Sequence, residues 1–287
     1  MQTKINAWLP LICALFFFYP QICPAQPLTL ESAVTEALTN APEIVESARK
    51  LNEIQTRLNA ALDAAVSPSA PASPGADSDL AALRSELQAA QAALKEARTK
   101  VPGQVKSAYI DAYYCRLSIP NLTERIGYLE TYLSQIEKAV RLGKTSKKTL
   151  TAVSQELSQL RGSRESAQAA GDAALDTLSL LTAREYTGQT SLSEAVFRED
   201  PRFEKQKQAL LQAGKRLGSA EKMLDTARDD LKYGMISNER YNQFQKKKTD
   251  AMSEYLELQI QYSKALSGNS GNSGNSGDSG GSGKGGA

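Results

Sequence analysis

The 287-residue chain contains no histidine, few aromatic residues and only three cysteines. Without histidine, the serine–histidine and cysteine–histidine catalytic pairs cannot form, and the commonest protein metal ligand is missing. Cys13 and Cys23 lie within the first 25 residues, so Cys115 alone remains beyond them. A single cysteine forms neither an internal disulfide nor a zinc site, and we expect it to be a small buried residue on a helix.

No glycine-rich phosphate-binding motif occurs either, and neither sign of charge dominates. The chain has 34 Lys and Arg residues against 32 Asp and Glu residues, which argues against a nucleic-acid partner. The carboxylates alternate with basic residues as on solvated helix flanks, rather than standing apart as a catalytic pair. We therefore expect no catalytic residue, no cofactor and no bound metal, and a protein that is not an enzyme.

The N-terminus resembles a secretory signal. Lys4 precedes an apolar run, and Cys23-Pro24-Ala25 then offers small residues for cleavage after residue 25. The alternative is an uncleaved anchor, but the run over 7–19 is shorter than the roughly 20 residues that span a bilayer. Residues 1–25 are thus predicted to be a signal peptide, and the protein is predicted to be exported to the periplasm.

Long helices are the main feature that the remaining sequence does contain. Five segments repeat apolar residues at alternating steps of three and four, over 80–101, 122–140, 150–181, 210–231 and 241–265. A repeat of 3.5 residues keeps a narrow apolar seam facing a partner helix, as in coiled coils. The spacing alone leaves open whether these seams pair within one chain or between chains.

The breaks between the segments predict how the helices are connected. Residues 67–79 carry three prolines and no apolar pattern, so they predict a loop whose last residues cap the next helix. Pro102-Gly103 and Pro120 predict kinks or short breaks. Two tetrapeptides, Gly143 to Ser146 and Gly234 to Ser237, predict tight turns, because glycine ends one helix and serine begins the next.

These breaks divide the chain into a helical segment over 26–66, the loop over 67–79, a first long hairpin over 80–186 and a second over 187–266. Residues 267–287 form a Gly-, Asn- and Ser-rich tail that cannot bury apolar surface, so we expect it to be disordered. The tail is either a spacer or without a role.

The two halves also resemble each other. A Leu and an Ala-Val pair recur in 29–34 and 191–196, and a helix-starting proline follows each copy, at Pro42 and Pro201. Each half then reaches its glycine-to-serine turn. The order of these features favours an internal duplication over a chance match between alanine-rich helices.

In this order the sequence resembles the outer-membrane efflux proteins, the TolC-like channel tunnels. LTLESAVTEALTNAPEI is similar to the start of that family, VKSAYIDAYYCRLSI to one of its helices, and RLGKTSKKTLTAVSQELSQL and KYGMISNERYNQFQ to its hairpin ends. The resemblance implies a homo-oligomer, a trimer in that family, whose hairpins build a periplasmic tunnel. It also implies contact with a periplasmic adaptor protein and an inner-membrane pump.

The resemblance assigns the adaptor contact to the hairpin tips, through Gly143, Ser146, Gly234, Met235, Ile236 and Ser237. The alternative is that these residues serve only the turns. The chain departs from the family in having no visible β-barrel: 67–79 is too short for two membrane strands, and 201–233 is continuous. Lys144 and Thr145 also replace the apolar turn residues common in the family.

The predicted fold is therefore all-α: long antiparallel coiled-coil hairpins, internally duplicated, without a visible barrel. The predicted function is that of a helical periplasmic component of an outer-membrane efflux or secretion system. The alternative is a coiled-coil structural or interaction protein of the cell envelope with no transport role. Association with the outer membrane itself stays open at this point.

Overall fold

The structure, a computed structural model, describes residues 27–66, 76–197 and 199–268. Its elements, in chain order, are α2 (Leu30–Asn40), α3 (Pro42–Val66), α4 (Ala76–Arg141), α5 (Lys147–Thr182), η1 (Pro201–Phe203), α6 (Glu204–Lys232) and α7 (Asn238–Gly268). The predicted all-α fold of long antiparallel hairpins is confirmed for this part of the chain. The predicted signal peptide lies outside the described residues.

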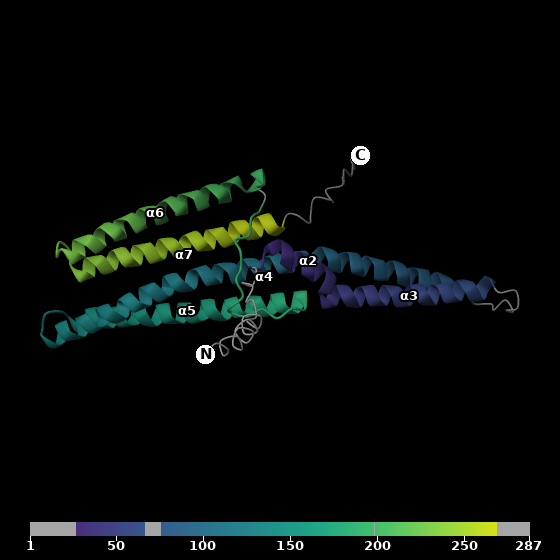
Figure 1. The fold of residues 1–287 in the computed structure, drawn as a ribbon, viewed down its shortest axis with the longest axis horizontal. Coiled ribbons are helices and arrows are strands. Elements are labelled where there is room, and N and C mark those ends of the chain that lie inside the picture. The colour runs from purple at the N-terminus through teal and green to yellow at the C-terminus, as the bar shows by residue number, and fades with distance from the viewer. Residues whose placement is uncertain (1–26, 67–75, 198, 269–287) are drawn as a thin grey trace, which may run out of the picture.

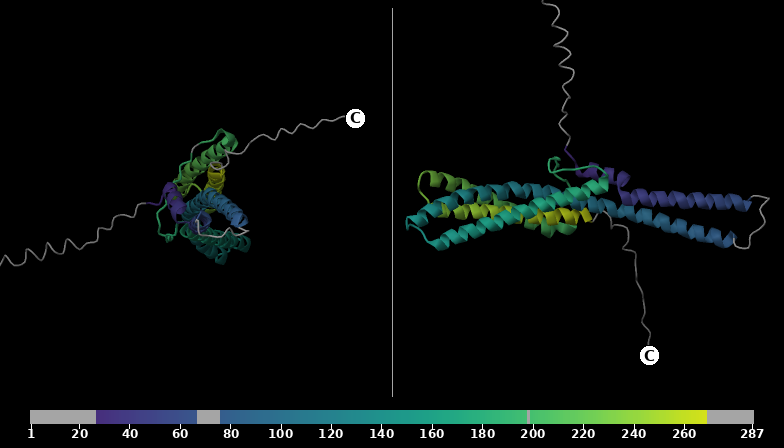
Figure 2. Two further views of the ribbon diagram at one scale, coloured as in Figure 1. Left: turned by 90° about the vertical axis from the view of Figure 1, so that its right-hand side faces the viewer. Right: turned by 90° about the horizontal axis from the view of Figure 1, so that it is seen from below.

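Helix α4 is the spine of the molecule, with 66 residues in one element. Its first half packs against α3, and its second half packs against α5 and α7. The views in Figures 1 and 2 agree that α3 and the first half of α4 extend at one end without a further helix beside them. The expectation of one hairpin over 80–186 was therefore incomplete, because α4 takes part in two hairpins that point in opposite directions.

The prolines inside α4 do not break it. Pro102 and Pro120 both lie within the helix, so of the predicted kinks or short breaks no break occurs at either proline. Val101 and Val105 are fully buried on either side of Pro102, and Leu122 is buried just after Pro120. Packing of these neighbours holds the helix together where a proline in an exposed helix would cost about 3 kcal/mol.

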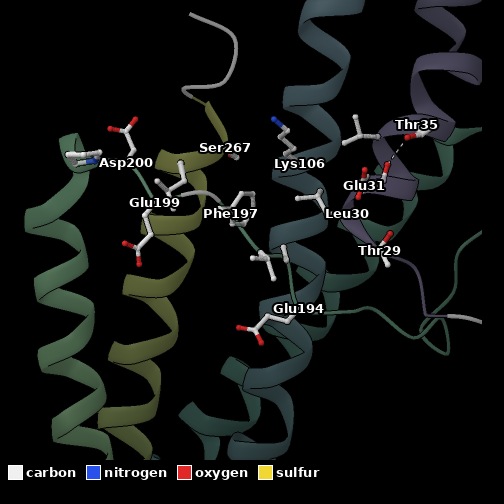
Figure 3. Close-up of a pocket in the computed structure, with 15 residues that line it drawn as sticks. Thr29, Leu30, Glu31, Thr35, Lys106, Glu194, Phe197, Glu199, Asp200 and Ser267 are labelled. Atoms are coloured by element: carbon white, nitrogen blue, oxygen red, sulfur yellow. Dashed lines mark hydrogen bonds between the residues drawn. The ribbon is translucent and has the colours of Figure 1, made fainter. Parts of the chain in front are cut away.

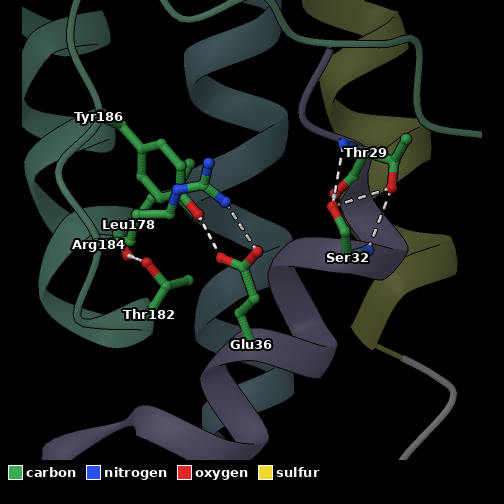
Figure 4. Close-up of polar contacts among 7 residues, drawn as sticks. All are labelled: Thr29, Ser32, Glu36, Leu178, Thr182, Arg184 and Tyr186. Carbon is green, nitrogen blue, oxygen red and sulfur yellow. Dashed lines mark hydrogen bonds and ion pairs between the residues drawn. The ribbon is translucent and has the colours of Figure 1, made fainter. Parts of the chain in front are cut away.

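The main core lies at the middle of the molecule, where α2, the start of α3, the middle of α4 and the end of α5 meet. Ala33 and Ala37 of α2 are fully buried there, and small side chains let this short helix sit close to α4 and α5. A capping box of Thr29 and Ser32 begins α2. Figure 4 shows this box and, beside it, Glu36 reaching the end of α5.

Glu36 ties α2 to the residues that follow α5. One carboxylate oxygen lies 3.0 Å from Arg184, and the other accepts a hydrogen bond of 2.9 Å from the Tyr186 hydroxyl (Figure 4). Ala183 at the end of α5 takes a left-handed conformation, φ 53°, which turns the chain back toward α2. The two contacts hold the connection to the second half against the core.

The connection between the halves is extended rather than helical. Leu28 pairs with Leu192 in an isolated parallel β-bridge, and the buried Tyr109 hydroxyl of α4 lies 2.6 Å from the Leu28 carbonyl oxygen and 2.7 Å from that of Ser193. The repeated segment with the Leu and the Ala-Val pair is therefore extended in its second copy, 191–196, whereas most of its first copy, 29–34, lies in helix α2. The second copy instead carries the chain across α4 toward α6.

Helices α6 and α7 form the last hairpin, whose seam follows the predicted heptads. Ala213, Ala220 and Ala227 are almost fully buried, and Leu217 and Leu224 alternate with them. Small residues at every second layer let α6 approach α7 closely. Helix α7 packs against both α6 and α4, so its buried residues include polar ones. The buried residues of α7 are Tyr241, Gln245, Thr249, Leu256, Ser263 and Ser267.

Two predicted boundaries were wrong by a few residues. Helix α4 begins at Ala76, so Asp77, Ser78 and Asp79 lie inside the helix and do not precede it as caps. Helix α7 continues through Gly268, two residues into the predicted tail. The rest of the predicted loop and tail, 67–75 and 269–287, lies outside the described residues. Within the described ranges, no helix has a stretch long and apolar enough to cross a membrane.

Candidate functional site at the hairpin tips

The first tip is a Schellman turn at the end of α4. Gly143 has φ 68°, a left-handed conformation that glycine adopts without strain. The Lys144 amide donates to the Ala139 carbonyl over 2.8 Å, and the Gly143 amide donates to Val140 over 3.0 Å. The Ser146 hydroxyl then accepts a hydrogen bond of 3.2 Å from the Thr149 amide and begins α5.

The second tip repeats this hydrogen-bonding pattern at the end of α6. Gly234 has φ 72°, and the Met235 amide donates to the Asp230 carbonyl over 2.7 Å. The Gly234 amide donates to Leu231 over 3.0 Å, and the Arg240 amide donates to the Ser237 hydroxyl over 3.2 Å. The two turns therefore match bond for bond, which confirms both predicted turns and supports the predicted duplication.

The fold brings both tips to the same end of the molecule, opposite the arm formed by α3 and α4 (Figure 1). Gly143, Ser146, Gly234 and Ser237 are exposed, and Met235 is 65% exposed. Ile236 differs, because it is half-buried against the cluster around Leu224 and Tyr241. Five of the six predicted site residues are thus open to solvent, and Ile236 anchors its turn.

Two exposed apolar side chains at the tips were not predicted. Leu142 is 68% exposed and Tyr233 is 72% exposed, and each directly precedes the glycine of its turn. An apolar residue just before a turn glycine was the signal available in the sequence. Together with Met235, these side chains place exposed apolar groups at both tips.

A buried arginine joins the two hairpins behind the tips. Arg125 of α4 is 1% exposed, and its Nη2 lies 2.5 Å from the Glu156 carboxylate of α5. Its Nη1 donates to the Asn242 carbonyl of α7 over 3.3 Å. One side chain thus contacts three helices. Arg125 Nε and three nearby amide oxygens, those of Asn121, Asn242 and Gln245, are buried without a hydrogen-bond partner.

Tyrosines fill the space between Arg125 and the second tip. The Tyr128 ring stacks near Tyr132 and meets the Tyr241 ring edge-on, with centroids 5.2 Å apart in the latter pair. The Tyr128 hydroxyl donates to the Asn238 carbonyl over 3.2 Å, at the first residue of α7. Burial raises the pKa of Tyr128 well above its ordinary value, so this donor stays protonated. These contacts fix where α7 begins and hence where its tip lies.

A cavity of about 840 Å³ lies near the other end of α7, between α2, α4 and the 194–201 segment. Leu30, Val34 and Phe197 contribute apolar walls, and Figure 3 shows acidic side chains from two sides, Glu31 on α2 and Glu194 on the connecting segment. Within the described ranges, no group of three or more His, Cys, Asp or Glu residues is placed to hold a metal ion.

The fold of this chain is similar to the folds of several solved outer-membrane channel proteins. The Campylobacter jejuni CmeC outer membrane channel matches over 83% of this chain and 84% of its own, with a TM-score of 0.61 at 10% identity. The outer-membrane channel OprN gives a TM-score of 0.61 at 8% identity, over 83% of this chain and 88% of its own. The Vibrio cholerae outer membrane protein VceC gives 0.55 at 12% identity, over 83% and 94%.

These similarities concern the fold, since the identities are 8–12%. No protein-family model matches the sequence, and no curated protein matches it at the sequence level. The structural neighbours are channel proteins rather than enzymes. The fold expected from the resemblance to TolC-like proteins is therefore confirmed.

Proposed function

We propose that this protein is a helical periplasmic component of an outer-membrane efflux or secretion system. The observation that carries the proposal is the pair of hairpins that end, on one side of the molecule, in turns with the same hydrogen bonds. The fold shared with outer-membrane channels supports it. On this reading, the exported chain assembles with copies of itself, as a trimer by family resemblance, and hairpins lying side by side form a conduit or scaffold.

The tips would be the surface that meets a periplasmic adaptor protein, and through it an inner-membrane pump. Leu142, Tyr233 and Met235 offer exposed apolar contact there, and the Schellman turns give that surface a fixed backbone shape. The Arg125 junction holds the two tips in a set relation to one another. The protein's part in transport would be structural, through the contacts that the tips and the hairpins make.

A structural or interaction protein of the cell envelope is the second candidate. It is favoured by the polar first turn, where Lys144 and Thr145 stand in place of the Met235 and Ile236 of the second turn. Such a protein would use the same hairpins as a spacer. Loss of drug tolerance or of secretion on deletion supports the transport role, whereas an unchanged phenotype with altered envelope integrity supports the spacer.

Crosslinking from the tips tests the adaptor contact. A photoreactive amino acid replaces Lys144 in one variant and Met235 in another, and Gln91, which is exposed on the opposite arm, serves as the matched control position. We expect crosslinks to a periplasmic adaptor, identified by mass spectrometry, from both tips and not from position 91. Light scattering on the purified protein measures its oligomeric state. A monomer at all concentrations that crosslinks to no adaptor would rule out the proposal.

A further inference from the structure

The two hairpin tips share a backbone geometry but differ in charge. The stretch 138–148, centred on the glycine of the first turn, has no acidic residue and five basic ones, Lys138, Arg141, Lys144, Lys147 and Lys148. The matching stretch around the second glycine, 229–239, has three acidic residues and one basic residue. Because the second turn forms the same hydrogen bonds without the basic cluster, the turn itself does not explain the charge of the first tip.

The basic cluster of the first tip, these five residues of 138–148, is open to solvent. All five side chains are exposed, and none forms an ion pair with another residue of the described ranges. Lys147 and Lys148 begin α5, and the N-terminus of a helix adds partial positive charge of its own. The second tip has Glu239 at the position of Lys148, which is the charge that a helix N-terminus favours. The cluster therefore opposes the local stability of α5, and its charge remains available to a partner.

An exposed leucine lies in the middle of the basic cluster. Leu142 is 68% exposed, and it stands in the chain between Arg141 and the Gly143-Lys144 pair. The turn is the free end of the hairpin formed by α4 and α5, so these side chains project from a convex surface (Figure 1). An apolar side chain among long basic ones is the composition of segments that bind at the surface of anionic bilayers.

The chemistry of the cluster favours a lipid surface over other anionic partners. A bilayer supplies phosphates for the basic side chains and, directly beneath them, hydrocarbon for Leu142. Nucleic acid offers the phosphates without an accessible hydrocarbon layer. Four of the five cations are lysines, whose flexible side chains suit a fluid surface, whereas arginine is enriched and lysine depleted in the fixed interfaces of proteins.

We propose that the first hairpin tip docks on an anionic membrane surface, with its basic cluster at the lipid phosphates and Leu142 inserted beneath them. This inference goes beyond the proposed function and does not rest on it, since a spacer protein of the envelope would use the same contact. It is compatible with an adaptor at the tips, because an adaptor that leads to an inner-membrane pump would lie beside the same bilayer.

Binding to vesicles tests the charged part of the contact. The chain, as its host exports it, is sedimented with vesicles of equal parts phosphatidylglycerol and phosphatidylcholine, and with vesicles of phosphatidylcholine alone, at several salt concentrations. Variant K147Q/K148Q removes two cations from the first tip. Variant K205Q/K215Q removes two exposed lysines of α6 away from the tips and is the control with the same change in net charge. Circular dichroism on heating measures the folding of each variant.

We expect the native chain to bind the vesicles that contain phosphatidylglycerol more tightly than those of phosphatidylcholine, and salt to weaken this binding by screening. K147Q/K148Q should raise the dissociation constant for the anionic vesicles about thirtyfold, because each cation near such a surface contributes about a factor of five. K205Q/K215Q should bind like the native chain. K147Q/K148Q should melt no lower than the native chain, since it removes positive charge from a helix N-terminus.

Tryptophan fluorescence tests the insertion of Leu142. The single tryptophan of the chain, Trp8, lies in the predicted signal peptide, so Leu142→Trp places a reporter at the first tip. Leu211→Trp, at a half-exposed position of α6, is the control. We expect the emission of the reporter at position 142 to move to shorter wavelength when the anionic vesicles are added, because the indole ring leaves water, and the emission at position 211 to stay unchanged.

Three results would overturn the proposal and leave the transport role standing. If the native chain does not bind the anionic vesicles, or binds both kinds of vesicle equally, anionic lipid is not its partner. If K205Q/K215Q weakens binding as much as K147Q/K148Q does, net charge rather than the first tip governs the contact. If the emission at position 142 does not change, the tip does not enter the bilayer, and an acidic protein becomes the partner to test.

Discussion

Arg125 and Glu156 form an ion pair whose two members differ in their access to water. Arg125 is 1% exposed, whereas the Glu156 side chain is 23% exposed. A buried charge that loses its partner has nowhere to be hydrated, while a carboxylate near the surface can be. The position was not predicted, because residue 125 is not among the apolar repeat positions of 122–140 and lies on the polar flank beside them. Its burial follows from the packing of α7 over that flank, which spacing within α4 does not reveal.

We therefore predict that Glu156→Ala costs more stability than Arg125→Met. The first change should lower the free energy of unfolding by about 3–5 kcal/mol, because it leaves the arginine buried and unpaired. Urea unfolding measures the difference. The matched control is the exposed pair of Arg161 and Glu130, which links the same two helices at 2.6 Å. Replacing Glu130 by Ala should cost about 0–1 kcal/mol; equal effects at the two sites would contradict the prediction.

Tyr109 makes stability depend on alkaline pH. Burial raises its pKa to about 12, against about 10 in the unfolded chain. A group with a raised pKa contributes fully below pH 10, and its contribution is lost as pH rises from about 10 through 12, because the unfolded chain then loses its proton first. Urea unfolding at pH 9, 10 and 11 should show falling stability.

Tyr109→Phe should be less stable than the native chain at pH 8, by about 1–3 kcal/mol, because the Leu28 and Ser193 carbonyls lose their donor. The free energy of unfolding of this variant should also fall less steeply than that of the native chain between pH 9 and 11. Other buried tyrosines, Tyr114 and Tyr186 among them, have pKa values raised in the same direction and keep part of the slope. Parallel curves for the two proteins would show that Tyr109 does not contribute.

At the scale of elements, the two turn glycines can be replaced without a steric clash, so the effect of a substitution reports on the backbone conformation alone. A Cβ atom at Gly143 or Gly234 would meet nothing within 4 Å, so only the left-handed backbone opposes a side chain there. Gly143→Ala and Gly234→Ala should each cost about 1–2 kcal/mol. Gly162→Ala, inside α5 and equally unobstructed, is the control and should gain up to about 1 kcal/mol. Thermal unfolding of the three variants distinguishes them, and a gain at Gly143 would contradict the turn argument.

The helices and turns could be predicted from sequence because their signals are local. The apolar positions from Leu80 to Val101 are all buried or half-buried, as the heptads predicted, and both glycine-to-serine turns form. The prolines of α4 and the extended conformation of 191–196 could not be predicted. Both depend on contacts distant in sequence, since Leu192 pairs with Leu28 and Val105 packs in the shared core.

At the scale of the whole molecule, α4 determines the shape. Its 66 residues extend about 100 Å at 1.5 Å per residue. A compact chain of this length would have a radius of gyration of about 19 Å, whereas a rod as long as α4 has one of about 30 Å. Small-angle X-ray scattering on the monomer should give a value near or above the latter. A value close to 19 Å would mean that the arms fold back.

The candidate site could be predicted only in part at this scale. The turns identified the tips, but the pairing of tips at one end depends on α7 lying along α4, which no local pattern encodes. The outer positions of α5 and α6 likewise follow from the order of the four helices, α5, α4, α7 and α6, and not from a pattern within either helix. Sequence showed which residues end the hairpins, and the arrangement of the hairpins showed which surfaces remain free.

The bridge between Leu28 and Leu192 has a consequence for how the chain folds. Each hairpin joins neighbours in sequence and needs to close only a short loop, whereas the bridge joins residues more than 160 positions apart. Contacts of such long sequence separation form late, because the loop entropy is lost before the contact is gained. The hairpins should therefore form early and independently of one another. The extended segment that contacts Tyr109 should join the two halves in the final step of folding.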